Sequence, residues 1–247
     1  MKKKQVILTI LTILSMIAIT GNTQVKSKDQ KAEEILNNFV SAAGGKNAHQ
    51  EIQNIVSTSE LIFLESGISI NRYISETRSN EYFIKISSSQ LGEIIRGYDG
   101  SDYWEKRQNK IRIIDDVEKK SILNSTAFLR YAQWQKHLTS YSYNGIVKTG
   151  EQELHKLDVV TIYGSKESWY FNISTFLLAQ IEEPLEMPEE IASVVTIFED
   201  YREVNGIMIS FSQTIQMPGQ TRRILFSEIL TNQQVDKSIF KIPAAEK

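Results

Sequence analysis

The sequence contains no cysteine, and it has only four prolines and three histidines among its 247 residues. Without cysteine there can be no disulfide framework, no thiolate metal site, no cysteine nucleophile and no lipid-modified cysteine at a processed N-terminus. The fold must therefore be held together by a hydrophobic core. A single domain of this length buries roughly 70% of its unfolded surface, which suffices without cross-links. Length alone leaves one domain or two open.

Neither sign of charge prevails, since 28 basic side chains stand against 30 acidic ones. A nucleic-acid groove needs a basic stretch interleaved with aromatic residues, and the sequence contains none. We therefore expect no nucleic-acid partner.

Recognisable catalytic patterns are scarce as well. His49, His137 and His155 are isolated, so the sequence has no His-x-x-x-His zinc pair, and it also lacks a Gly-x-Ser-x-Gly elbow and a Gly-rich phosphate loop. Asp115 and Asp116 adjoin at a predicted strand end, but neighbouring carboxylates on a strand point to opposite faces. We expect no enzyme, no cofactor and no metal site.

The N-terminus resembles a secretory signal peptide. Lys2, Lys3 and Lys4 precede an uncharged run of 15 residues, 6–20, that is rich in Ile and Leu. This run is shorter than the roughly 20 residues that span a bilayer, and small residues follow it where a signal peptidase cuts. We predict a cleaved signal peptide over residues 1–23 and export to a bacterial periplasm, with an uncleaved anchor as the alternative. The mature chain then keeps 25 basic and 30 acidic residues.

An amphipathic helix is predicted over residues 28–43. Its apolar positions recur with helical spacing, at Ala32, Ile35, Leu36, Phe39, Val40 and Ala43. Ser27 and Gln30 form a candidate capping box, and Gly44 and Gly45 end the helix. A short second helical turn is expected over residues 47–53.

Short segments rich in β-branched and aromatic residues follow, and Gly, Asn, Asp and Ser separate them. The predicted strands are 55–64, 67–76, 81–88, 91–99, 102–107, 110–116, 142–149, 156–164, 167–173, 176–182, 194–203, 206–217 and 221–231. Asn205-Gly206 is the strongest hairpin signal. No Gly-rich or Pro-rich linker divides the strands, so we expect one mainly β domain over residues 24–247, built as a continuous antiparallel meander.

Several strands carry apolar residues on both faces, for example 61–64 and 224–226, so both faces of the sheet must be covered. The N-terminal helix can cover one side. Residues 120–138 predict a second helix with a broad apolar face, which either packs plainly on the sheet or forms a movable lid over an apolar cavity. Residues 184–191 are expected to add a short, acidic cover.

Five motifs in this order resemble the outer-membrane lipoprotein-sorting, LolA-like family of Gram-negative bacteria. They are the helix end 42–46 (Ala-Ala-Gly-Gly-Lys), Tyr98-Asp99-Gly100 with Trp104, the hairpin 170–179, the hairpin 201–207 and the closing segment 232–243. The resemblance implies an open, curved antiparallel sheet, an incomplete β-barrel, covered by an N-terminal helix and a lid helix over an apolar cavity. It also implies a noncatalytic periplasmic carrier that holds acyl chains of lipoproteins or another lipid.

The resemblance further implies a monomer that exchanges cargo with lipoprotein-handling proteins of the inner and outer membranes. Arg78 matches the family's arginine that helps hold the lid closed, although Thr77 and Ser79 replace the lysine and proline beside it. The expected cavity or lid residues are Arg78, Phe83, Trp104, Phe128, Tyr131, Trp134 and Leu138. Trp104 and the lid aromatics can equally be ordinary core. The alternative function is an envelope protein-interaction or scaffold module whose cavity its own side chains fill.

Overall fold

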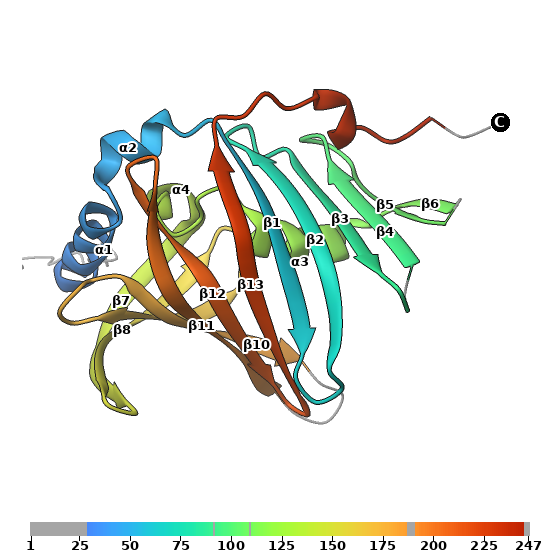
Figure 1. Ribbon diagram of the computed structural model, residues 1–247. Helices are drawn as coiled ribbons and strands as arrows, with labels where there is room; N and C mark the ends of the chain where they lie inside the picture. Colours follow the sequence, from blue (N-terminus) through green and yellow to red (C-terminus); the bar gives the residue numbers. More distant parts are fainter. Residues whose placement is uncertain (1–28, 91, 109, 187–190, 245–247) are drawn as a thin grey trace, which may run out of the picture.

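One antiparallel sheet of thirteen strands organises the chain in the computed structural model, which describes residues 29–244 without 91, 109 and 187–190. The predicted signal peptide, 1–23, lies outside the described residues. Strands β1 and β13 pair in the middle of the sheet, and β6 and β7 are its two edges, so the sheet is not closed. The curved sheet in Figure 1 confirms the incomplete barrel that the resemblance implied.

All thirteen predicted strands are present, with ends that differ by a few residues. They are β1 (Asn54–Phe63), β2 (Ile68–Thr77), β3 (Tyr82–Ser88), β4 (Gly92–Tyr98), β5 (Tyr103–Arg107), β6 (Lys110–Ile113), β7 (Leu138–Thr149), β8 (Gln152–Thr161), β9 (Lys166–Asn172), β10 (Leu178–Glu186), β11 (Ile191–Val204), β12 (Ile207–Met217) and β13 (Gln220–Thr231). Asn205 and Gly206 both have positive φ, 52° and 82°, as a tight hairpin turn between β11 and β12 requires.

The N-terminal helix α1 (Gln30–Ala42) is as predicted, but its cap differs. The Asp29 carboxylate accepts hydrogen bonds from the backbone N–H of Lys31 and Ala32, whereas the expected cap, Ser27, lies outside the described residues. A second helix, α2 (Gly45–Glu51), follows directly. Gly44 joins the two with φ 113°, and a Cβ on it would lie 2.1 Å from the Gly206 carbonyl oxygen. The close approach of this junction to the β11–β12 hairpin therefore requires glycine.

The prediction of one continuous helix over residues 120–138 is wrong. The segment contains α3 (Asp116–Thr126) and the short α4 (Trp134–His137), separated by the cover loop, residues 127–133. Leu129 in this loop has φ 46°, a left-handed conformation that no α-helix contains. Asp115 caps α3 through its carboxylate, so it belongs to a helix start and not to a strand end.

The predicted acidic cover over residues 184–191 is also corrected where the structure describes it. Residues 184–186 extend β10, and their partners on β11 are residues 191–193. Residues 187–190 lie outside the described part.

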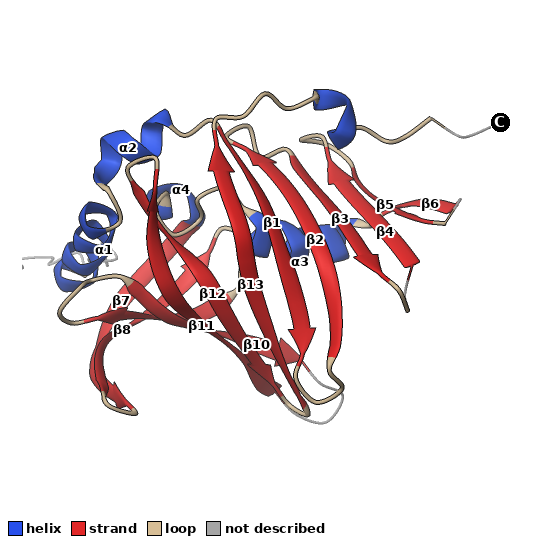
Figure 2. Cartoon of the chain, in the orientation of Figure 1, coloured by secondary structure: helices blue, strands red, loops and turns tan. Residues whose placement is uncertain are grey.

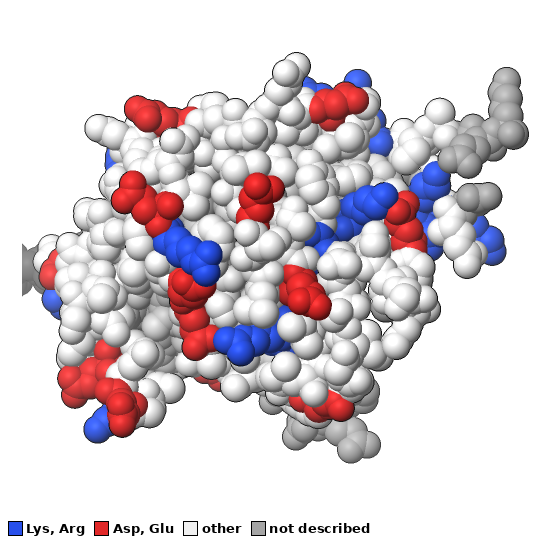
Figure 3. Space-filling view, in the orientation of Figure 1, with Lys and Arg blue, Asp and Glu red and all other residues white. Residues whose placement is uncertain are grey.

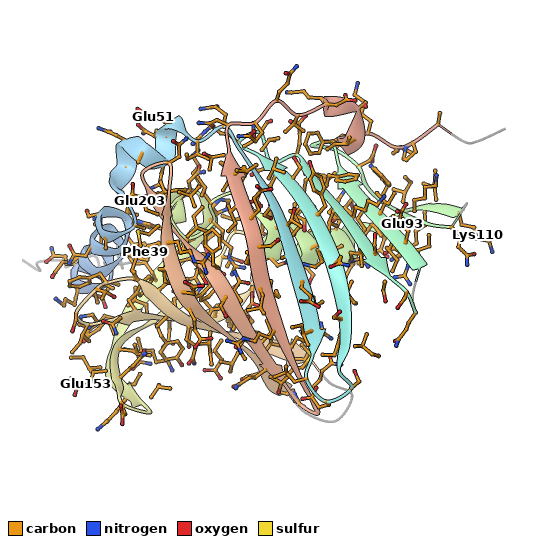
Figure 4. The ribbon with its side chains drawn as sticks, viewed as in Figure 1. Phe39, Glu51, Glu93, Lys110, Glu153 and Glu203 are labelled. Atoms are coloured by element: carbon orange, nitrogen blue, oxygen red, sulfur yellow. The ribbon has the colours of Figure 1, made fainter. Side chains whose placement is uncertain are left out.

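The helices cover the concave side and one end of the sheet. Helices α3 and α4 lie behind the sheet in the view of Figure 2, whereas α1 lies beside β7 and α2 lies beside β12. Phe39, labelled in Figure 4, joins α1 to the sheet, since its ring centroid lies 5.4 Å from that of Phe171 on β9. A 3₁₀ helix, η1 (Lys237–Phe240), packs against β3 and β4.

The outward surface is mixed in charge. On the face shown in Figure 3, acidic and basic groups alternate, and neither sign forms a continuous patch. Among the described residues, no helix combines the length and the apolar character that a membrane crossing demands.

Candidate ligand-binding cavity

A cavity of about 540 Å³ lies between the cover loop and the concave face of the sheet. This volume falls within the range of about 300–1,000 Å³ that is usual for small-molecule sites. Most of its wall is apolar and comes from strands on both sides of the sheet centre. Representative wall residues are Ile74, Val194, Phe198, Ile215, Ile224 and Phe226.

Polar side chains interrupt this wall on β2 and β3. Arg72 and Glu76 lie on the same face of β2 as Ile74, and Tyr82 of β3 is the in-register partner of Glu76. The Arg72 Nε donates a hydrogen bond to Ser59 Oγ at 3.1 Å. Burial raises the pKa of Glu76 to about 7, and burial also raises the pKa of the Tyr82 phenol. The cavity is thus apolar with one polar region.

A buried ionic cluster fixes the cover loop to the sheet. The Arg130 guanidinium pairs with Glu167 on β9, and its Nη1 lies 3.4 Å from a Glu183 oxygen on β10. Glu167 also accepts hydrogen bonds from Asn124 Nδ2 at 2.9 Å and from Trp169 Nε1 at 2.8 Å. Burial raises the pKa of Glu183, opposed by the Arg130 charge. Because both Arg130 and Glu167 are buried, the pair is a strong constraint on the loop.

Tyr131 is the one of the seven expected site residues that lines the cavity within the described part of the chain. Its ring makes edge contacts with Trp169 and Phe198, at centroid distances of 5.1 and 5.6 Å. The Arg130 guanidinium lies 5.2 Å from the Tyr131 ring centroid. The ionic cluster therefore positions this aromatic wall.

Arg78 and Phe128 lie together at the end of the sheet beside α2. The Arg78 side chain donates hydrogen bonds to the carbonyl oxygens of His49 and Ile52, the latter at 2.8 Å from Nε. The guanidinium also lies 5.6 Å from the Phe128 ring centroid. Phe128 is buried in a core cluster with Ile52, and so plugs the sheet end instead of lining the cavity.

Phe83 and Trp104 lie on the opposite, outer face of the sheet. They flank Gly97 in register, and a Cβ on Gly97 would lie 2.5 Å from atoms of the Trp104 indole. Trp104 is buried, and its Nε1 donates to the Phe240 carbonyl oxygen at 2.9 Å. Trp104 therefore binds the C-terminal segment to the sheet.

Trp134 and Leu138 belong to the core cluster beneath α1. Trp134 is buried, and its ring makes an edge contact with Tyr141 at 5.3 Å. Its indole N–H has no hydrogen-bond partner among the described residues. Leu138 begins β7 and packs against the same cluster.

The polar cavity residues Arg72, Glu76 and Arg130 were missed from the sequence. Alternation along residues 70–76 places Ile70, Arg72, Ile74 and Glu76 on one face, which is a usable signal. That signal does not say which face is concave. The sequence predicts Phe83 as a cavity residue, whereas its neighbour Tyr82 lines the cavity. Adjacent residues on a strand point to opposite faces, so an error of one position selects the wrong face.

The three histidines lie apart in the fold. The Nδ1 of His49 lies 2.8 Å from the Gly45 carbonyl oxygen, and the Nδ1 of His155 lies 3.3 Å from the Tyr143 hydroxyl. Burial lowers the pKa of His49, His137 and His155. The described residues contain no group of three or more His, Asp or Glu side chains arranged to hold a metal ion.

Three of the solved structures that share this fold come from different bacteria. A DUF1329 family protein from Desulfovibrio piger has a TM-score of 0.60 at 12% identity and covers 87% of this chain and 99% of its own. A LolA superfamily protein from Nitrosomonas europaea has a TM-score of 0.59 at 10% identity, and the match covers 85% of this chain and 97% of that protein. An outer membrane lipoprotein-sorting protein domain from Vibrio parahaemolyticus has a TM-score of 0.57 at 11% identity. The match covers 85% of this chain and 96% of that domain.

Neither a protein-family model nor a curated protein sequence matches the chain. At identities of 10–12% the structural matches establish the fold alone. The chain thus has the LolA-like fold that its sequence motifs predicted.

Proposed function

We propose that this protein is a noncatalytic periplasmic carrier that holds an acyl chain of a lipoprotein or another lipid in its cavity. The observation that carries the proposal is the apolar cavity of about 540 Å³ between the cover loop and the concave sheet. Each methylene group moved from water into such a wall gains about 0.8 kcal/mol, so a long chain is stabilised without a covalent bond.

The alternative expected from the sequence is a scaffold whose cavity is filled by its own side chains. That alternative requires packing at ordinary interior density beneath the cover loop. The volume beneath residues 125–132 favours the carrier.

Roles for the expected site residues follow from their places in the fold. Tyr131 contacts the acyl chain directly, because it lines the cavity. Arg78 and Phe128 hold the end of the sheet closed beside α2, and Trp134 and Leu138 anchor the cover from beneath α1. Phe83 and Trp104 act only through the stability of the outer face.

The proposed carrier is exported to the periplasm. The signal peptide over residues 1–23 is cleaved, and the single domain over residues 24–247 works as a monomer in the periplasm. Its partners are lipoprotein-handling proteins of the two membranes. The mass of the mature chain from a periplasmic extract tests the cleavage, since an uncleaved chain contradicts it.

The test of the carrier function is ligand recovery and uptake. Mature protein purified without detergent is extracted with organic solvent, and the extract is analysed for lipids by mass spectrometry. In parallel, the delipidated protein is titrated with a fluorescent fatty acid. We expect bound lipid or saturable uptake at one site. A protein that carries no lipid and takes up none is no carrier.

A further inference from the structure

Arg72 is a cation in the cavity wall, and none of the residues that the structure describes gives it a carboxylate partner. Its in-register neighbours are Ser59 on β1 and Ile86 on β3, which carry no charge. Its one hydrogen bond within the described residues runs from Nε to Ser59 Oγ. No ion pair joins Arg72 to an acidic residue in this part of the chain. The guanidinium therefore keeps most of its five N–H donors available.

Two other arginines on this side of the sheet have carboxylate partners. Arg96 Nε lies 2.6 Å from Glu105 Oε2 on the neighbouring strand, and Arg130 pairs with Glu167. Burial opposes the charged form of Arg72 and lowers its pKa, and the Tyr82 phenol partly offsets this shift, although arginine stays protonated near neutral pH. A partly buried guanidinium in such surroundings gains from a planar anion, which accepts two parallel N–H bonds.

The surroundings of Arg72 also fit an acyl chain. Phe226 lies across β1 from Arg72, in register with Ser59, and continues into the apolar wall with Ile224. Glu76 lies four residues along β2, so its Cα is roughly 13 Å away on the same face. Ile74 occupies the position between Arg72 and Glu76 on this face, so the described part of β2 places no carboxylate between these two residues.

We propose that Arg72 binds the anionic headgroup, a carboxylate or a phosphate, of a single-chain lipid whose acyl chain lies along the apolar wall. This inference rests on the proposed carrier function and specifies the headgroup chemistry of its cargo. Arg72 gives the cavity a polar end, so the ligand enters in one orientation.

The experiment measures binding of matched amphiphiles by isothermal titration calorimetry. The delipidated mature chain is titrated with dodecanoate, dodecyl phosphate and uncharged methyl dodecanoate, each below its micelle concentration. Sodium acetate serves as the free anion without a chain. The variants are Arg72→Met, Arg72→Lys and the control Arg223→Met, which removes an exposed arginine outside the cavity lining. Thermal unfolding verifies that each variant is folded.

The wild type is expected to bind dodecanoate or dodecyl phosphate at least about tenfold more tightly than the methyl ester. Arg72→Met abolishes this preference and leaves ester binding unchanged, Arg72→Lys retains part of it, and Arg223→Met retains all of it. If Arg72→Met does not fold, the wild-type preference for the charged amphiphile and its reduction in Arg72→Lys decide the question.

Three results would overturn the inference. The first is equal affinity of the wild type for the ester and the acid, which leaves the carrier function intact. The second is binding of acetate as tight as that of dodecanoate, which identifies a free-anion site. The third is no binding of any amphiphile, which also removes the proposed function.

Discussion

The buried ion pair between Arg130 and Glu167 connects the loop over the cavity to strand β9. Glu167 has further hydrogen bonds from Asn124 and Trp169, so its two oxygens have three donors. Any opening of the cover at this point must separate two charges that are both buried. The cover is therefore fixed at its centre, and ligand entry is expected at its margins.

Breaking this pair should destabilise the protein strongly. Arg130→Met leaves Glu167 buried without its cation, and we expect a loss of about 3–5 kcal/mol in the free energy of unfolding, measured with urea. Lys31→Met is the matched control, because Lys31 pairs with Glu34 on the exposed face of α1. The control should stay within about 0.5 kcal/mol of the wild type. Equal effects of both substitutions would contradict the anchoring role of Arg130.

Gly97 should be intolerant of a methyl group. Gly97→Ala places a Cβ 2.5 Å from the Trp104 indole, and we expect a cost of about 1–3 kcal/mol from overpacking. The cost should shrink when Trp104→Leu removes the indole. A double-mutant cycle by urea unfolding measures this coupling. Simple additivity of the two substitutions would show that the close contact does not determine the effect.

Glu76 should make stability depend on pH. Burial raises its pKa from the ordinary 4.5 to about 7 in the folded chain, so the folded state binds the proton more tightly than the unfolded state. The stabilising contribution is complete below about pH 4.5 and is lost as the pH rises through about 7.

Glu76→Gln removes this dependence. Between pH 5 and 8, the wild type should lose up to about 3 kcal/mol of unfolding free energy relative to the variant. Urea unfolding of both proteins across this range checks the difference. Parallel pH profiles would mean that the Glu76 carboxyl titrates normally.

Filling the cavity should block uptake without unfolding the protein. Val194 lines the cavity, whereas its neighbour Val195 lies on the other face of β11. Val194→Phe is expected to reduce fatty-acid uptake at least about tenfold, because the ring occupies space that the chain needs. Val195→Phe should bind as the wild type does. Thermal melts of both variants distinguish lost binding from lost fold, and loss of uptake in both variants would argue against this cavity as the site.

The strands could be predicted from the sequence because their signals are local. Turn residues such as Asn205-Gly206 and short β-branched runs mark each hairpin, and the structure places all thirteen strands where they were expected. The cover could not be predicted in this way. The apolar spacing of residues 120–138 indicates one helix, but Arg130 turns inward to meet Glu167, a partner 37 residues away.

Predicting which residues line the cavity also requires knowledge of contacts between residues that lie far apart in the sequence. Alternation groups Arg72 with Glu76, yet only the curvature of the sheet and the position of the cover decide that this face is enclosed. Trp104 is a residue that the sequence predicts for the cavity and the structure places outside it. Its indole N–H donates to the Phe240 carbonyl oxygen, 136 residues later. A conspicuous tryptophan therefore belongs to the outer core and not to the cavity.

A crystal structure of the mature chain with dodecanoate would show directly whether the cavity holds an acyl chain. The carrier account predicts an acyl chain between the cover loop and strands β1, β2 and β11 to β13. A cavity that contains only ordered water, or a ligand bound elsewhere on the molecule, would contradict it.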